Sequence, residues 1–222
     1  MIVTIDGPAG SGKSTAAKGL AARLGFRFLD TGALYRVTAY ECLRAGVDAN
    51  DEAAAVRIAD ALDVRFDEDR VFSAGTDVTT EIRTPTITEA ASVVARFPGV
   101  RQAMDRRQRK LAIGQNIVTE GRDQGTVVFP AAQCKFFLMA DTEERAIRRK
   151  REMETQGHSI ALEELAVQIE DRDRRDADRA VAPLKAAADA IPVETSRMNA
   201  AEVIDLLERT VREIQAKPPG HS

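Results

Sequence analysis

The segment Gly7–Ser14 has residue types and spacing that predict phosphate chemistry. Its sequence, Gly-Pro-Ala-Gly-Ser-Gly-Lys-Ser, fits the pattern GxxxxGK[ST]. The glycines allow several backbone N–H groups to face one anion, and a helix that follows points its positive end at that anion. Lys13 can reach the β- and γ-phosphates of a nucleotide and is expected to contact only this ligand, while the Ser14 hydroxyl can ligate Mg²⁺. The expected nucleotide-binding residues are Gly7, Pro8, Ala9, Gly10, Ser11, Gly12, Lys13, Ser14 and Thr15.

Three further segments, at 29–36, 120–130 and 172–183, each contain at least one arginine and one aspartate. Arg122 and Asp123 directly follow an apolar, strand-like run. Ligands of open parallel sheets bind beyond the carboxyl ends of the strands, so both residues are expected in a site. Arg36 taken alone is also consistent with a solvated helix residue, and Asp30 is favoured as a helix N-cap.

A dense run of charge, with four Asp and four Arg residues, extends from Asp171 to Arg179. Such a run usually forms a solvated helix face. A charged segment with little apolar surface also suits a lid, which stays open in water and closes on a polyanion. Two basic clusters, at 106–110 and 148–151, have the same two interpretations, a solvated face or an anion contact.

Strand-like and helix-like patterns alternate along most of the chain. Apolar runs predict strands at 2–5, 26–29, 116–119, 135–139 and 190–193. Helical periodicity and capping signals predict helices at about 14–24, 31–46 and 51–62, from Pro85, from Pro98, twice between 142 and 175, and along 203–214. The segment after Asp63 departs from this alternation and predicts a small β insertion. Alternation of this kind implies a parallel sheet covered on both faces by helices.

Composition restricts the class of protein. The 222 residues suit one domain, and 44% hydrophobic with 30% charged residues exclude disordered, collagenous and membrane classes. A net charge of −3 argues against a broad surface for a nucleic-acid duplex. No stretch approaches the ~18 apolar residues of a membrane helix, and the start of the chain does not resemble a secretory signal.

The cysteines and the missing signals narrow the class further. Cys42 and Cys134 form no CxxC pair and are expected to be buried, reduced thiols of a cytoplasmic protein. The sequence contains neither DxxG nor NKxD, which disfavours a GTP-driven switch. Only two histidines are present, so a histidine-based catalytic triad is not expected.

In order and spacing, the phosphate-loop motif and the three charged segments together resemble bacterial cytidylate kinases. The resemblance extends from Met1 to about Glu213, and the runs GRDQGTVVFP at 121–130 and RAVAP at 179–183 are its most specific parts. It implies an α/β, P-loop kinase-like three-layer fold with a central parallel sheet, a small β insertion in the monophosphate-binding region and a helical lid. It also implies a single domain over 1–222, with its core at 1–62 and 114–216, an acceptor-binding insertion at about 63–113 and a lid at about 150–183.

The resemblance also implies an activity, the transfer of phosphoryl from ATP, with Mg²⁺, to CMP or dCMP. Arg36 and Arg122 match arginines that hold the acceptor phosphate in that family. Ser92, Arg101 and Asp123 match residues that read the cytosine ring. The implied partners are small nucleotides only, with no nucleic-acid polymer and no membrane, and the implied protein is a cytoplasmic monomer.

The lid segment supplies the remaining implied residues. Arg172 and Asp176 match residues near the acceptor sugar, and Arg179 matches a lid arginine that closes over the phosphates. Lys13, Arg122 and Arg179 are thus the expected catalytic residues, Ser14 the expected metal ligand, and Thr31 a further expected substrate-binding residue. Glu120 departs from the family pattern, because many members carry Asp before GRD, and its role stays open.

Physical chemistry supports a site built mainly from cations. A phosphate monoester has a second pKa of ~6, so at pH 7 the acceptor is already an oxyanion and needs no protein base. Arginines would then serve by reducing the repulsion between two anions. Two alternatives remain: another small phosphate-loop kinase resembling adenylate or shikimate kinases, and a nucleotide-binding regulator without turnover. The presence of Lys13, Arg122, Asp123 and Arg179 argues against the regulator.

Overall fold

The computed structural model describes residues 1–67, 70–155, 160–179 and 181–216. The chain forms two compact units, one of residues Met1–Leu29 with Gly114 onward, and one of residues Asp30–Ile113. The predicted acceptor-binding insertion, at about 63–113, lies within the second unit. The two helices of residues 31–61 also pack within this unit, as described below. Parts of the predicted lid, 156–159 and 180, lie outside the described residues, as do both histidines.

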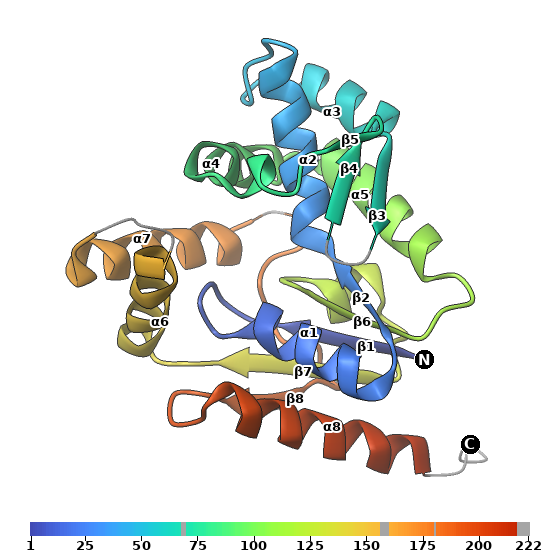
Figure 1. Ribbon diagram of the computed structural model, residues 1–222, viewed down its shortest axis with the longest axis vertical. Helices are drawn as coiled ribbons and strands as arrows, with labels where there is room; N and C mark the ends of the chain where they lie inside the picture. The colour runs from blue at the N-terminus through green and yellow to red at the C-terminus, as the bar shows by residue number, and fades with distance from the viewer. Residues whose placement is uncertain (68–69, 156–159, 180, 217–222) are drawn as a thin grey trace. The chain divides into compact units, whose positions relative to one another are not determined.

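A five-stranded sheet organises the first unit (Figure 1). Its strands are β1 (Ile2–Asp6), β2 (Arg27–Asp30), β6 (Ile117–Gly121), β7 (Cys134–Met139) and β8 (Ile191–Glu194). The order is β2-β6-β1-β7-β8, and β1 pairs in parallel with both β6 and β7. Asp6 lies opposite Gly121 in this register. The carboxyl ends of the central strands therefore meet at one edge, where Arg122 and Asp123 were expected to contribute to a site.

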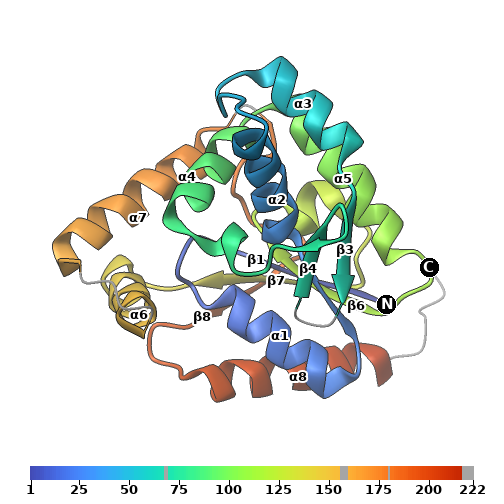
Figure 2. The same cartoon turned by 45° about the horizontal axis from the view of Figure 1, so that its top comes forward.

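Helices flank this sheet. They are α1 (Lys13–Leu24), α6 (Thr142–Thr155), α7 (Leu162–Ala177) and α8 (Ala200–Ala216). Helices α1 and α8 lie side by side in Figures 1 and 2, and a Cβ on Gly19 of α1 would lie 2.3 Å from Ile204 of α8. Their buried faces join those of the strands in one core, which includes Leu20, Phe136 and Leu207. The parallel sheet with flanking helices confirms the predicted fold class.

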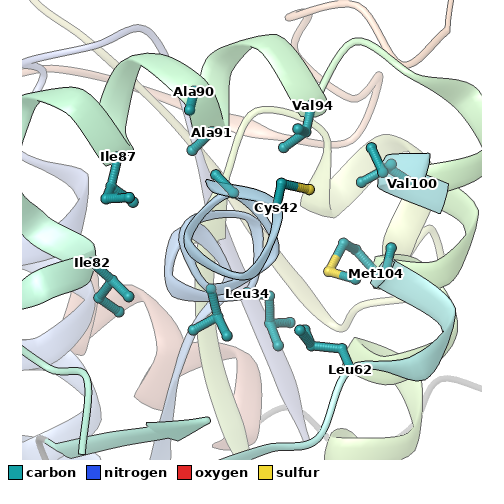
Figure 3. Close-up of a cluster of buried hydrophobic side chains, with 14 of the residues drawn as sticks. Leu34, Cys42, Leu62, Ile82, Ile87, Ala90, Ala91, Val94, Val100 and Met104 are labelled. Atoms are coloured by element: carbon teal, nitrogen blue, oxygen red, sulfur yellow. The ribbon is translucent and has the colours of Figure 1, made fainter. Parts of the chain in front are cut away.

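The second unit is built around α2 (Thr31–Arg44). Its other elements are α3 (Glu52–Ala61), β3 (Val64–Asp67), β4 (Arg70–Ser73), β5 (Thr76–Asp77), the 3₁₀ turn Glu81–Arg83, α4 (Pro85–Val94) and α5 (Pro98–Ala112). Strands β3, β4 and β5 form a separate antiparallel sheet, which confirms the small β insertion. Figure 3 shows Leu34 and Cys42 of α2 surrounded by apolar side chains such as Ile82, Val94 and Met104. Pro85 begins α4 and Pro98 begins α5, as predicted.

Local capping explains where the helices of the second unit begin and how they are held. Asp30 Oδ1 accepts the N–H of Ala33 at 2.9 Å, which confirms Asp30 as the N-cap of α2. In the basic cluster at 106–110, Arg106 pairs with Asp60 at the surface. Arg107 donates to the carbonyl of Asp60 at 2.9 Å and so caps the end of α3. Both arginines therefore have structural partners within the unit.

Cys42 and Cys134 are buried and free, as expected from the sequence. Burial raises the pKa of the Cys134 thiol to about 12, so this side chain stays an uncharged packing group. Across the described ranges, no helix is both long and apolar enough to cross a bilayer.

Candidate active site

The phosphate loop connects the end of β1 to the start of α1, as its motif predicts. Gly7, Gly10 and Gly12 have φ angles of 148°, 76° and 85°, which L side chains rarely adopt. A Cβ on Gly7 would also lie 2.1 Å from the carbonyl oxygen of Leu138 on β7. Glycine is thus required at these positions by backbone conformation, and at Gly7 by the close approach of the neighbouring strand.

Lys13 is buried in this loop, with only 5% of its surface exposed. Its Nζ donates to the carbonyl of Pro8 at 2.5 Å and lies 3.4 Å from Ser11 Oγ. The expectation that Lys13 contacts only a ligand was therefore wrong, because the loop curls its own carbonyl toward the ammonium. Burial, and then the charges of Arg122 and Arg172, lower the pKa of Lys13 to about 7, while Glu120 opposes this shift.

Ser14 and Glu120 bring a hydroxyl and a carboxylate together. Ser14 is in the first turn of α1, Glu120 is in β6, and Ser14 Oγ donates to Glu120 Oε1 at 3.1 Å. Mg²⁺ typically takes one or two carboxylates, waters and the phosphates of a nucleotide. No larger group of three or more His, Cys, Asp or Glu residues suited to a metal occurs in the part of the chain that the structure describes. Ser14 and Glu120 fit Mg²⁺ that is bound together with a nucleotide.

Asp176 bridges two of the predicted arginines. Its Oδ2 accepts from Arg122 Nε at 2.7 Å, and its Oδ1 accepts from Arg179. Burial works against charge on both Arg122 and Asp176, but their attraction outweighs it. The pKa of Arg122 is therefore raised and that of Asp176 lowered from their ordinary values. Arg172 also acts electrostatically on both Lys13 and Asp176. The structure thus brings together five predicted residues, Lys13, Arg122, Arg172, Asp176 and Arg179.

Helix α7 also contacts the phosphate loop through a residue that the sequence did not single out. Asp173 Oδ1 accepts the N–H of Ala9 at 3.2 Å, and Asp173 pairs with Arg145 of α6. Arg145 in turn donates to the carbonyl of Ala9 at 3.2 Å. Within the described residues, the predicted lid is helical at 150–155 and 162–177, and α7 is joined to the loop by polar contacts.

The segment after β6 forms a short turn of π-helix, Gln124–Val128, which no sequence pattern predicted. Asp123, which precedes it, is 4% exposed. Asp6, at the end of β1, accepts the N–H of Gln124 at 2.9 Å and that of Gly125 at 2.7 Å. Asp6 immediately precedes the phosphate loop, and this position was the only signal that the sequence offered for it.

We predict that Asp6 makes the stability of the protein depend on pH. Burial raises the pKa of its carboxyl from 3.8 to about 6, despite two hydrogen bonds that lower it. A raised carboxyl pKa favours folding below the unfolded-state value, and this contribution is lost as the pH rises through the folded-state value. Relative to Asp6→Asn, the wild-type free energy of unfolding should fall by up to about 3 kcal/mol between pH 4 and pH 7. Parallel denaturant titrations of both proteins measure this, and a constant difference across that range would refute it.

The basic cluster at 148–151 supplies one residue at the loop. Arg148 NH2 donates to the carbonyl of Thr195, and its NH1 donates to Thr195 Oγ1 at 3.1 Å. Thr195 Oγ1 in turn donates to the carbonyl of Ser11 at 3.3 Å. Arg148 therefore supports the loop through Thr195, which follows β8.

The remaining predicted residues, Thr31, Arg36, Ser92 and Arg101, belong to the second unit. Thr31 begins α2 and is 4% exposed. Arg36 NH1 is buried without a hydrogen-bond partner in the described residues and lies 3.9 Å from Asp30 Oδ1. A buried guanidinium N–H without such a partner is costly unless an anion completes it. Arg36 is therefore suited to receive an anionic group.

Arg101 and Ser92 are held by their own unit. Arg101 is 4% exposed, donates to the carbonyl of Ala95 at 3.2 Å and lies 5.7 Å from the centre of the Tyr35 ring. Ser92 Oγ donates to the carbonyl of Thr88 at 3.2 Å, one helical turn earlier. The structure thus links Arg101 to α2 through Tyr35, while the recorded bond of Ser92 is within α4.

Comparison with known proteins agrees with this arrangement. A family model described as cytidylate kinase matches residues 3–213. A cytidylate kinase of Rhodopirellula baltica is 45% identical over 213 residues, covering 96% of this chain and 93% of that protein. A cytidylate kinase of Caldanaerobacter subterraneus subsp. tengcongensis is 44% identical over 210 residues, covering 95% and 94%.

A solved structure shows similarity of fold alone. An uncharacterized protein from Eubacterium ventriosum matches with a TM-score of 0.56 at 13% identity, covering 98% of this chain and 99% of that chain. The family assignment depends instead on the sequence matches, which extend over nearly the whole chain and include the phosphate loop and the GRD segment. On these grounds the chain belongs to the cytidylate kinase family.

Proposed function

We propose that this protein transfers the γ-phosphoryl group of ATP to the phosphate of CMP or dCMP, giving ADP and CDP or dCDP. The observation that carries the proposal is the convergence of Lys13, Arg122 and Arg172 beside the phosphate loop. Burial, and after it repulsion from the two arginines, lowers the pKa of Lys13 in the free protein. An anion bound among them would relieve that repulsion, so the site is suited to two phosphate groups that must approach each other.

In this mechanism the protein positions charges and supplies no base. The N–H groups of the loop and the Lys13 ammonium would hold the β- and γ-phosphates of ATP. Arg122 would hold the acceptor phosphate, with Nε fixed on Asp176. Arg179 would stabilise the charge that develops during transfer. Mg²⁺, held by Ser14 and Glu120 with the nucleotide phosphates, would neutralise charge on the phosphates.

The residues proposed to bind the acceptor come from two parts of the chain. They are buried Asp123 of the first unit, and Thr31, Arg36, Ser92 and Arg101 of the second. In this proposal Arg36 holds the phosphate of the acceptor, which would give its buried NH1 a partner. Residues 63–113 would act as the acceptor-binding insertion and 150–183 as the lid.

A coupled assay of ADP release tests the proposed substrates. With ATP and Mg²⁺, we expect turnover with CMP and dCMP to exceed that with UMP, AMP and shikimate. Faster turnover with AMP or shikimate would favour another small phosphate-loop kinase. No turnover with any acceptor, together with tight ATP binding, would favour a nucleotide-binding regulator.

Asp123→Asn should weaken the use of CMP more than the binding of ATP. The substitution keeps the size of a buried side chain but replaces a carboxylate with an amide, which changes the hydrogen-bond pattern offered to the cytosine amine. We expect kcat/KM for CMP to fall ~10²-fold, with the Kd of ATP changed less than ~3-fold. Asp178→Asn, in the last part of the charged run, is a matched control. A fall in ATP affinity without a fall in CMP use would place Asp123 in the wrong subsite.

The proposed lid should respond to both nucleotides. Leu165 and Ile169 of α7 are buried against Ala146 of α6, with Leu162 and Ala166 half-buried beside them, whereas residues 171–179 are attached by charged contacts. ATP would compete with Asp173 for the N–H of Ala9, and bound phosphates would recruit the lid arginines. We expect hydrogen exchange in 171–179 to be fast in the free protein and to slow when ATP and CMP, or a bisubstrate mimic, are bound. Equal exchange with and without ligand would mean that α7 is a fixed helix.

The proposed setting is a cytoplasmic monomer that acts on small nucleotides, without a nucleic-acid polymer or membrane partner. Two buried, unpaired cysteines are consistent with a reducing compartment. Light scattering during size-exclusion chromatography, with and without nucleotides, measures the oligomeric state.

A further inference from the structure

Asp6 is a buried carboxylate at the junction of two functional loops. It ends β1, is 4% exposed and directly precedes Gly7, the first residue of the phosphate loop. Its register partner on β6 is Gly121, directly before Arg122. A buried carboxylate needs strong partners to offset the loss of water, so the position requires an explanation.

Both carboxylate oxygens of Asp6 bind the backbone of the other loop. Oδ1 accepts the N–H of Gln124 at 2.9 Å, and Oδ2 accepts the N–H of Gly125 at 2.7 Å. These are consecutive residues of the π-helical turn, so the carboxylate holds the turn at two points. Hydrogen bonds to an ionised acceptor are about twice as strong as neutral ones.

Close packing on β1 and a side-chain hydrogen bond from β6 also hold this turn in place. A Cβ on Gly125 would lie 2.9 Å from Thr4 Oγ1 and 3.4 Å from Asp6 Oδ2, so the turn packs directly on β1. Thr119 Oγ1 also donates to Gln124 Oε1 at 3.0 Å, across the start of the turn. The path of the backbone from β6 into the turn is therefore determined by β1.

We infer that Asp6 is a positioning residue, which fixes Arg122 and Asp123 relative to the phosphate loop by holding the N–H groups of Gln124 and Gly125. Arg122 and Asp123 lie between Gly121, which pairs with Asp6 in the sheet, and Gln124, whose N–H binds the Asp6 carboxylate. Their backbone is therefore held at both ends. Asp6 thereby links the ATP side of the site to the acceptor side. The inference rests on the proposed function for its kinetic consequences but not for the structural link itself.

Asp6→Asn tests the link because it keeps the shape of the side chain and loses one acceptor oxygen. An amide oxygen can accept only at one end, so Gln124 or Gly125 loses its charged partner. We expect kcat/KM for CMP to fall ~10²-fold, as for a small misplacement of reacting groups, with the Kd of ATP changed less than ~3-fold. Amide exchange measured by NMR should be faster at Gln124 and Gly125. Asp48→Asn, the same substitution at an exposed aspartate before α3, is the control and should change neither readout.

Gly125→Ala is a second variant, since it pushes the turn away from Thr4 and Asp6 without altering the carboxylate. Gly125→Ala should likewise lower kcat/KM for CMP while leaving the Kd of ATP nearly unchanged. It replaces Asp6→Asn in the test if that variant does not fold. Equal losses in CMP use and ATP affinity, or unchanged exchange at Gln124 and Gly125, would overturn the inference. Amide exchange and ATP binding need no turnover. Wild-type protein inactive on CMP would contradict the proposed function, while the exchange measurement would still decide the role of Asp6.

Discussion

Lys13→Met should lower kcat for CMP phosphorylation by ~10²- to 10³-fold, the loss typical of one donor that stabilises the transition state. Methionine keeps the length and apolar stem of lysine but removes the ammonium. The buried ammonium of the free protein is destabilised by desolvation and by neighbouring arginines, which lower its pKa to about 7. Its charge is therefore useful mainly when phosphates are bound. Steady-state kinetics with saturating CMP and ATP measure the effect.

The stability of this variant separates a catalytic from a structural role. Lys13→Met removes one donor from the Pro8 carbonyl, which still accepts from Ser11 Oγ at 3.0 Å, and it also removes a buried charge. The free energy of unfolding should therefore change by no more than about 2 kcal/mol. Lys18→Met, on the exposed side of the same helix, should retain normal kcat. Near-normal activity of Lys13→Met would contradict the assignment of the phosphate loop.

Arg122→Lys should lower kcat/KM for CMP by ~10²-fold even though the charge is kept. Arg122 uses Nε to bind Asp176 and NH1 to bind the carbonyl of Gly121 at 3.3 Å, which leaves NH2 of its planar fork to meet a phosphate. A lysine ammonium cannot do both, because its three donors diverge from one atom at the end of a flexible stem. The kinetic constants for CMP, measured at saturating ATP, test this expectation.

Arg175→Lys is the matched control for this change. Arg175 lies on the exposed side of α7 and donates only to the carbonyl of Asp171 among its recorded bonds. It should retain normal kinetics with both nucleotides. If Arg122→Lys were as active as the wild type, a point charge would be sufficient at this position and the proposed two-part role of Arg122 would be wrong.

The phosphate loop could be predicted because its conformation is encoded locally. Glycines with positive φ at Gly10 and Gly12, and the contact of Gly7 with β7, leave few other residues possible there. The partners of its side chains could not be predicted. Asp6 and Gln124, which share a hydrogen bond, are separated by 118 positions in the sequence, and Arg122 and Asp176 are separated by 54. Such pairings depend on strand register and helix packing, which have no local signal.

The charged run was partly predictable from helical spacing. Asp173 and Asp176 follow buried Leu165 and Ile169 on the inner side of α7, where they meet Arg145 and Arg122. Arg174 and Arg175 lie on the exposed side, as a solvated helix face would require. Both interpretations of the run therefore apply, each to a different face of one helix.

The packing partners of helix α2 could not be predicted from the alternation of strands and helices. Helix α2 follows β2 directly in the sequence. Its Leu34 and Cys42 pack against α4 and α5 (Figure 3), and Asp30 at its start pairs with Arg83. Tertiary packing thus decided an assignment that periodicity left unconstrained.

A labelled phosphoryl group shows directly whether the protein transfers the γ-phosphoryl group of ATP to CMP. ATP labelled with ³²P at the γ-position is incubated with the protein, Mg²⁺ and CMP, and the products are separated. We predict that the label appears in the β-phosphate of CDP and that CDP and ADP form at the same rate. The variants Lys13→Met and Arg122→Lys should form labelled CDP far more slowly. Label released as inorganic phosphate at the same rate with and without CMP would contradict it.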